Sequence, residues 1–157
     1  MRILITGGKG GTGKTLIASN LAYLASLRGL PTLLVDADIG NPSTWITLGA
    51  PKPKPISTVY SFRPVIDKSK CNLCGKCAEA CPTHALVLIP NKGLLLIDTL
   101  CEGCTLCMYT CPLKAIKEGS NIAGWILRTQ LKSLPIIIGE LRPVSYTHLR
   151  AHETRHD

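Results

Sequence analysis

Hydrophobic positions in the first fifty residues follow two different periods. A short apolar run within residues 2–6 predicts a strand, and five glycines in residues 7–13 then interrupt it. Between residues 14 and 27 the large aliphatic side chains recur at helical spacing, which predicts a helix that ends at Arg28 and Gly29. A second apolar run at residues 32–35 predicts a buried strand. Together these elements predict a β-α-β unit, the building block of a parallel sheet.

The hydrophobic pattern changes after residue 50. Prolines alternate with lysines at residues 51–55, which predicts an extended linker and a domain boundary, because proline removes backbone donors. Apolar residues at 87–89 and 94–97 predict short strands. Two further apolar stretches, residues 122–127 and 135–138, are candidates to pair as strands. The chain is therefore expected to hold two small domains rather than one large core.

Composition narrows the classes of function. The 157 residues are 45% hydrophobic and 18% charged, which is a globular balance. No apolar run approaches the roughly 18 residues of a membrane span, and the start lacks a long apolar export segment, so a cytoplasmic location is expected. Aromatic residues make up only 4%, too few for a platform that stacks nucleic-acid bases. The net charge of +8 arises mainly in residues 1–70, with nine Lys or Arg against three Asp, and no recognition motif accompanies it.

Residues 8–15 read G-K-G-G-T-G-K-T and match the phosphate-binding pattern G-x-x-x-x-G-K-[ST] between a predicted strand and a predicted helix. Glycines let successive backbone N–H groups face phosphate oxygens at the positive end of the helix. Lys14 is expected to reach the β- and γ-phosphates of ATP, and the Thr15 hydroxyl to bind Mg²⁺. The alternative is a glycine turn that binds nothing. The predicted nucleotide site comprises Gly8, Lys9, Gly10, Gly11, Thr12, Gly13, Lys14 and Thr15.

Two carboxylates follow the second predicted strand. Asp36 and Asp38 lie where open α/β sheets bind their ligands, at the carboxyl ends of the strands. A purely structural alternative is that they cap the turn through Asn41 and Pro42. The nearby phosphate loop favours a role at the nucleotide.

All eight cysteines lie in two copies of C-x-x-C-x-x-C-x-x-x-C-P, which repeat at an offset of 30 residues. This is the bacterial ferredoxin pattern, in which the fourth cysteine of each run serves the other cluster. The sequence therefore predicts two 4Fe-4S clusters: one held by Cys71, Cys74, Cys77 and Cys111, the other by Cys101, Cys104, Cys107 and Cys81. Zinc is the competing metal, although its structural sites usually space two C-x-x-C pairs further apart. Disulfides would require an oxidising compartment. His84 and Tyr109 are interpreted as packing or surface residues.

The last fourteen residues differ from the rest of the chain. Residues 144–157 place His148, His152 and His156 four apart, so that on a helix they could mimic a metal site. This stretch resembles the translation of a sequencing-library adapter. We therefore expect an artefactual tail that makes no core contacts and is dispensable for cluster binding.

The loop K-G-G-x-G-K-T, with its additional Lys9, resembles the deviant Walker A loop of the MinD/ParA-type ATPases, which include nitrogenase iron protein. A phosphate loop followed by the double cysteine run resembles the members of that superfamily with an inserted two-cluster ferredoxin domain. The resemblance implies that Lys9 reaches the partner's nucleotide in a nucleotide-dependent homodimer. It also implies that Asp36 belongs to the Mg²⁺ shell and that Asp38 positions the attacking water, which makes Lys9, Lys14 and Asp38 the expected catalytic residues.

The expected fold class is α/β: part of a P-loop NTPase with a parallel sheet and an inserted α+β ferredoxin-like domain. Expected limits are 1–60 for the first part of the ATPase, 61–118 for the insertion, 119–143 for a return segment and 144–157 for the tail. The expected function is ATP hydrolysis linked to electron transfer or iron-sulfur delivery to an acceptor protein. The alternatives are an electron carrier with a regulatory nucleotide site, and spatial partitioning on membrane or DNA. The family's later D-x-x-P-G segment has no counterpart here, so this stretch alone is not expected to turn over ATP.

Overall fold

The computed structural model describes residues 1–90 and 92–142. Helix α1, Lys14–Leu27, has the predicted bounds, and Gly29 has a φ of 75°, the left-handed conformation that lets the chain leave the helix. Its buried face consists of small residues, Ser19, Ala22 and Ser26. The large aliphatic side chains that predicted the helix are 44–60% exposed. Small side chains therefore set how closely α1 approaches the sheet.

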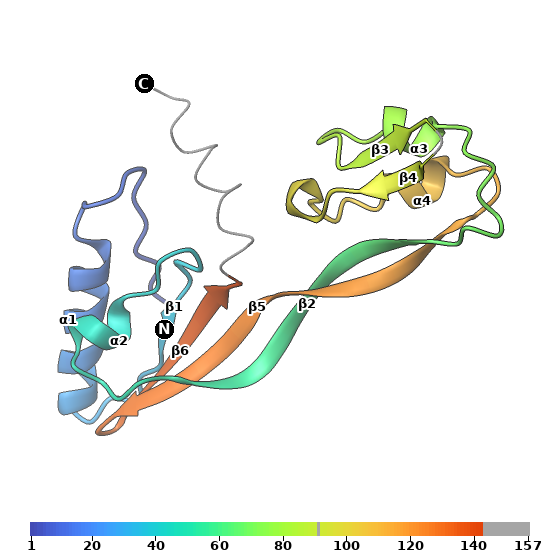
Figure 1. The fold of residues 1–157 in the computed structure, drawn as a ribbon. Coiled ribbons are helices and arrows are strands. Elements are labelled where there is room, and N and C mark those ends of the chain that lie inside the picture. Colours follow the sequence, from blue (N-terminus) through green and yellow to red (C-terminus); the bar gives the residue numbers. More distant parts are fainter. Residues whose placement is uncertain (91, 143–157) are drawn as a thin grey trace. The chain divides into compact units, whose positions relative to one another are not determined.

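The main sheet has four strands in the order β1-β6-β5-β2. Their bounds are Leu34–Asp36 for β1, Lys54–Ile66 for β2, Ile116–Leu131 for β5 and Leu134–Leu141 for β6. Strand β1 runs parallel to β6, whereas β5 and β6 form an antiparallel hairpin. Helix α1 and the short helix α2, Thr44–Thr47, cover one face of β1 and β6 (Figure 1). The α/β class is therefore confirmed, and the sheet is mixed.

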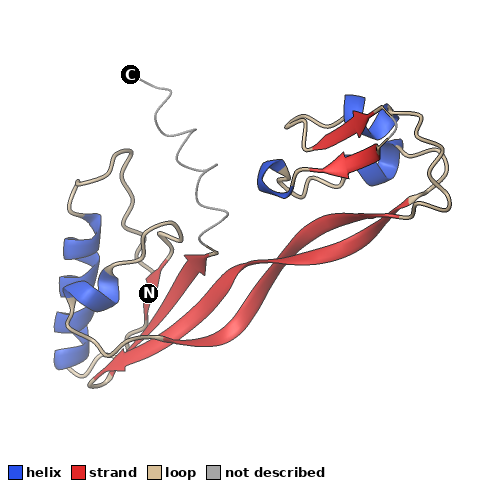
Figure 2. Cartoon of the chain, in the orientation of Figure 1, coloured by secondary structure: helices blue, strands red, loops and turns tan. Residues whose placement is uncertain are grey.

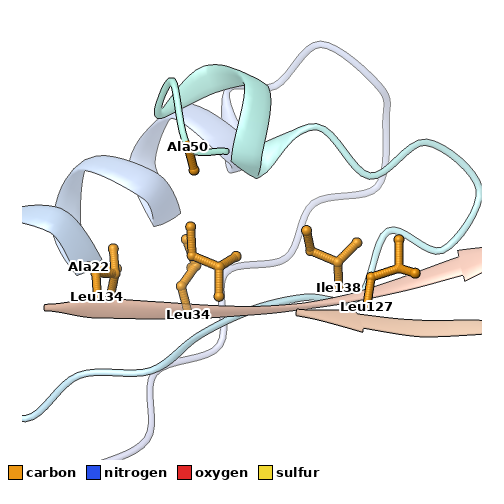
Figure 3. Close-up of a cluster of buried hydrophobic side chains, with 7 residues drawn as sticks. Ala22, Leu34, Ala50, Leu127, Leu134 and Ile138 are labelled. Atoms are coloured by element: carbon orange, nitrogen blue, oxygen red, sulfur yellow. The ribbon is translucent and has the colours of Figure 1, made fainter. Parts of the chain in front are cut away.

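A small apolar core lies between these helices and the sheet (Figure 3). Alternate side chains of β6 enter it, because successive residues of a strand face opposite sides. Leu134, Ile136 and Ile138 are fully buried, at 0% exposure. The remaining buried members are Ala22, Leu34, Ala50 and Leu127. At the margin, the Ser26 and Ser133 hydroxyls lie 2.8 Å apart, which links α1 to the β5–β6 turn.

Two sequence-based expectations for this part were wrong. Residues 2–6 form no strand, and Ile3 and Leu4 are 56% and 86% exposed. The parallel neighbour of β1 is β6 instead, which belongs to a segment a hundred residues further along the chain. A strand is stable only where a neighbour pairs with its backbone, and residues 2–6 lack that pairing. The second wrong expectation is that the whole proline-rich stretch at 51–55 is a linker, because Lys54 and Pro55 already belong to β2. As an edge strand, β2 tolerates the missing N–H of a proline.

Other expectations for the strands were confirmed. The apolar stretches at 122–127 and 135–138 lie in the paired strands β5 and β6, with Leu127 opposite Ile138. The hairpin turns at Lys132, which has a φ of 51°. The second predicted strand also exists, although β1 begins at Leu34 rather than at residue 32.

The chain divides into two compact units. Met1–Val59 and Gly124–Arg142 form the first, and Tyr60–Ala123 belongs to the second. The second contains a hairpin of β3, Leu86–Ile89, and β4, Gly93–Leu96, which confirms the two predicted short strands. It also contains helices α3, Lys76–Glu79, and α4, Leu106–Thr110, and a 3-10 turn, Asp98–Leu100 (Figure 2). The domain limits at 61 and 118 stay a prediction.

Among the helices of residues 1–90 and 92–142, none combines the length and apolarity that crossing a bilayer requires. The three histidines of the predicted tail, and the tail itself, lie outside the described residues.

Candidate phosphate loop and cysteine centres

The two cysteine runs share their left-handed backbone positions. Each contains three left-handed positions, and the three positions of one run match those of the other at the offset of 30 residues. The matching pairs are Leu73 and Gly103 (φ 58° and 71°), Gly75 and Thr105 (78° and 65°), and His84 and Lys114 (52° and 47°). Gly75 and Thr105 immediately precede the short helices α3 and α4. Sequence repetition therefore produces structural repetition around the cysteines.

One cavity brings together four cysteines from both runs. Its lining includes Cys71, Cys74 and Cys77 of the first run and Cys111 of the second. These are the four residues assigned from the sequence to one cluster. The other lining residues are mainly aliphatic and include Leu73, Leu88, Leu94, Leu113 and Ile116. A thiol-lined cavity with apolar walls fits an iron-sulfur cluster, which is bound by cysteine sulfur and tuned by its exclusion from water.

The second run presents its first three cysteines in the same way. Cys107 is buried like Cys77, Cys104 is exposed like Cys74, and Cys101 is half-buried like Cys71. Burial, and then the nearby Cys101 and Cys104, raise the pKa of Cys107 to about 11. Burial, followed by the proximity of Cys111 and Cys71, likewise raises the pKa of Cys77. A bound cation would oppose these shifts, since coordination to a metal deprotonates a thiol.

The fourth cysteine of each run accepts a backbone hydrogen bond. The N–H of Ala85 donates to Cys81 Sγ and the N–H of Ala115 donates to Cys111 Sγ, both at 3.3 Å. Burial acts to raise the pKa of Cys81, but hydrogen bonds from Leu86, Thr83 and Ala85 outweigh it, so the pKa is lowered. Hydrogen bonds to ligand sulfurs are one of the factors that set the reduction potential of an iron-sulfur cluster.

A set of cysteine thiolates is compatible with either zinc or an iron-sulfur cluster, because thiolates bind both. In the described part of the chain, no three His, Cys, Asp or Glu side chains converge as they would around a single metal ion. The cysteine spacing remains the feature that favours clusters.

Two charged residues contact the ends of the cysteine runs, and neither was singled out from the sequence. Arg63 of β2 donates to the carbonyl oxygens of Asp98, at 2.9 Å, and Cys101, at 3.4 Å. Asp67, which follows β2, accepts the N–H of Cys71 on its carbonyl oxygen at 3.0 Å. Hydrogen bonding from Ser69 and Lys117 lowers the pKa of Asp67 to about 2. No motif marks either residue: Arg63 acts on a run 38 residues away, and Asp67 lies outside the cysteine pattern.

Gly103 is a further residue that sequence reasoning missed. A Cβ at this position would lie 3.0 Å from the backbone oxygen of Phe62, so the second run packs directly on β2. The equivalent residue of the first run is Leu73, which is 48% exposed. No signal in the sequence marks Gly103, because all the residues between the cysteines differ between the two runs.

The predicted phosphate loop precedes α1 as an exposed turn. Gly11 and Gly13 have φ values of 75° and 79°, which glycine adopts without strain. The Lys14 amine folds over the loop and donates to the Lys9 carbonyl at 2.9 Å. Thr12 Oγ1 donates to the same carbonyl at 3.2 Å. The loop thus places the amine of Lys14 beside the N-terminus of α1, whose first N–H groups have no acceptor within the helix.

The two aspartates differ in their surroundings. Asp36 is 8% exposed and accepts four hydrogen bonds: from the backbone N–H groups of Asp38, Ser43 and Thr44, each at 3.1 Å, and from the Thr44 hydroxyl at 2.9 Å. These contacts organise the start of α2, which is the kind of structural role considered as the alternative from the sequence. Asp38 is exposed. No ion pair joins Lys9 or Lys14 to either aspartate within the described residues.

Comparison with known proteins identifies the family. Residues 3–136 match the CobQ/CobB/MinD/ParA nucleotide-binding domain, also called CbiA. The chain therefore belongs to this family of nucleotide-binding domains, and its second unit is a ferredoxin-like insertion, as the sequence pattern indicated.

Individual relatives match between about two fifths and about two thirds of the chain. Pyruvate synthase subunit PorD of Methanocaldococcus jannaschii is 38% identical over 61 residues, which cover 39% of this chain and 71% of that protein. A ferredoxin of Pyrobaculum islandicum is 43% identical over 38% of this chain and 55% of its own length. The M. jannaschii protein MJ0579 is 32% identical over 68% of this chain, but the match spans only 38% of that relative.

Proposed function

We propose that this protein is an ATP-binding iron-sulfur protein that couples a nucleotide switch to electron transfer, or to iron-sulfur delivery, through two 4Fe-4S clusters. The observation that carries the proposal is the cavity lined by Cys71, Cys74, Cys77 and Cys111. Three of these cysteines come from one run and the fourth from the other, which is the arrangement of two-cluster ferredoxins. The similarity to a ferredoxin and to a pyruvate synthase subunit supports the same interpretation.

The roles of the protein residues follow from their positions. Each bound cluster would store and release one electron. The thiols of Cys101, Cys104, Cys107 and Cys81 would hold the second cluster, while the aliphatic side chains around the first cavity would limit the contact of its cluster with water. The N–H groups of Ala85 and Ala115 stabilise negative charge on Cys81 and Cys111. The cysteine unit would therefore accept electrons from a redox donor and pass them to an acceptor protein.

The nucleotide half of the proposal rests on the phosphate loop. Residues 8–15 would bind the phosphates of Mg²⁺-ATP, with Lys14 at the β- and γ-phosphates and Thr15 at Mg²⁺. Lys9 is exposed and lies before the left-handed turn at Gly11, so its side chain is free to reach a nucleotide bound by a second subunit. A nucleotide-dependent homodimer is therefore part of the proposal. Exposed Asp38 would position the attacking water, and Asp36 would contact Mg²⁺ through water while it organises α2.

A second candidate function is an electron carrier in which nucleotide binding only regulates assembly. The four hydrogen bonds that occupy the Asp36 carboxylate favour it, because they assign this aspartate a structural role. The two candidates differ in whether the rate of ATP hydrolysis changes with the redox state of the clusters. In the coupled mechanism that rate changes on reduction, and in the regulatory one it does not.

Anaerobic reconstitution tests the cluster assignment directly. We expect about eight irons and eight sulfides per chain and a broad thiolate-to-iron absorption band at about 400 nm. Cys111→Ala should damage the cluster otherwise held by Cys71, Cys74 and Cys77. Cys104→Ala is the matched control, because it should damage the other cluster. Stoichiometric zinc without sulfide would refute the proposal, and damage by Cys111→Ala confined to the cluster of the Cys101 run would refute the ligand pairing.

A further inference from the structure

Two ion pairs flank the cysteine runs, and they are oriented in opposite ways. The Arg63 side chain is 17% exposed, whereas that of its partner Asp98 is 73% exposed, at a separation of 3.4 Å. In the other pair the order of charges is reversed: the Asp67 side chain is 19% exposed and that of Lys117 is 62% exposed, at 3.2 Å. Water screens the outer member of each pair far more than the inner one. The inner charge is therefore a cation in the first pair and an anion in the second.

Each inner charge belongs to a residue that touches a different cysteine run. Arg63 donates to the carbonyl of Cys101, the first cysteine of the second run. Its backbone neighbour Phe62 lies against Gly103, so this part of β2 is fixed on the second run. Asp67 accepts the N–H of Cys71, the first cysteine of the first run, and its carboxylate accepts the Ser69 hydroxyl at 2.6 Å. The charged residues inside the runs, Lys76, Glu79 and Glu102, are all exposed and are therefore screened by water. Arg63 and Asp67 thus supply the half-buried charges that differ between the two runs.

A nearby charge shifts a one-electron equilibrium, because reduction adds one negative charge to the cluster. A half-buried cation stabilises the reduced form and raises the reduction potential, and a half-buried anion lowers it. We propose that Arg63 and Asp67 set an order of reduction potentials. The cluster held by Cys101, Cys104, Cys107 and Cys81 has the higher potential, and the cluster held by Cys71, Cys74, Cys77 and Cys111 has the lower one. This inference rests on the proposed two-cluster function.

The order gives electron transfer a direction within the protein. With both clusters bound, an electron from a low-potential donor would pass from the site of Cys71, Cys74, Cys77 and Cys111 to the site of Cys101, Cys104, Cys107 and Cys81, one electron being lost at the first site and gained at the second. It would then be available there to an acceptor protein. No proton is transferred and no covalent bond changes in this step. The electron count is balanced by one external donor and one external acceptor.

The test is a potentiometric titration of the reconstituted full chain, followed by electron paramagnetic resonance. Iron and sulfide are measured first, since a chain that binds no clusters refutes the proposed function rather than the order. Cys74→Ala and Cys104→Ala then assign the two signals to the two runs. In the unaltered chain, we expect the signal lost in Cys104→Ala to have the higher potential.

Charge variants identify the cause. Arg63→Gln should lower the equilibrium constant for reduction of the second cluster about tenfold, which corresponds to a potential lower by about 59 mV for one electron, and leave the first cluster nearly unchanged. Arg63→Lys keeps the charge and should restore most of the shift. Asp67→Asn should raise the potential of the first cluster, whereas Arg128→Gln, an exposed arginine of the other unit, should change neither. Equal shifts in both clusters, no shift, or a reversed order would overturn the proposal.

Discussion

Replacement of Asp36 by alanine separates a structural from a metal-binding role at this position. The change removes the acceptor of four hydrogen bonds, three of them from backbone N–H groups. A hydrogen bond to a charged group contributes about 1.5–3 kcal/mol, and these contributions do not add fully, because partly buried donors recover water. Only the two bonds from Thr44 are buried. We therefore expect Asp36→Ala to lower the free energy of unfolding by about 3 kcal/mol.

The assay is urea unfolding followed by circular dichroism, without nucleotide or magnesium. Asp38→Ala is the matched control: its side chain is exposed, and such a surface change is expected to stay within about 0.5 kcal/mol. Loss of Mg²⁺-ATP binding in Asp36→Ala with unchanged stability would refute the reasoning, because it would make the carboxylate a metal ligand with no structural role. A large loss of stability in both variants would show that the hydrogen bonds of Asp36 are not the cause.

Three further predictions concern the loop, the core and the cysteine repeat. In a protein that also contains the family's D-x-x-P-G segment, Lys14→Ala should abolish Mg²⁺-ATP binding in calorimetry. Asp38→Ala should there leave the affinity within about a few-fold and reduce hydrolysis about 100-fold, as expected for a residue that positions water; equal loss of both would contradict that role. Ile136→Ala should cost about 3 kcal/mol in urea unfolding, because Ile136 is 0% exposed, and the partly exposed Ile126→Ala should cost clearly less. Gly103→Ala should destabilise the cysteine unit by about 1 kcal/mol more than Gly75→Ala, because only Gly103 faces a backbone oxygen at 3.0 Å, and equal losses in thermal unfolding would disprove the contact.

Local patterns in the sequence were sufficient for several features. The bounds of α1 follow from aliphatic spacing and the Arg28-Gly29 end signal, since a helix is specified by residues close in the chain. The matching left-handed positions of the two cysteine runs follow in the same way from the repeat. The P-loop pattern and the order of the two motifs also indicated the family that residues 3–136 match. The helix and the left-handed positions depend on interactions within a few residues of one another, and each motif is recognised from a short stretch of sequence.

Tertiary structure decided what depends on distant neighbours. The sequence predicted strands at both residues 2–6 and residues 32–35. Only the second prediction corresponds to a strand, β1, because β6 pairs with its backbone. The buried face of α1 was also decided by the tertiary structure. The leucines predicted the position of the helix in the sequence, but the small residues Ser19, Ala22 and Ser26 form its buried face. Arg63 and Asp67 are ordinary charged residues in the sequence and gain their significance from the cysteine runs that they touch. The physical reason is that burial, strand pairing and the screening of a charge are set by the whole surrounding structure.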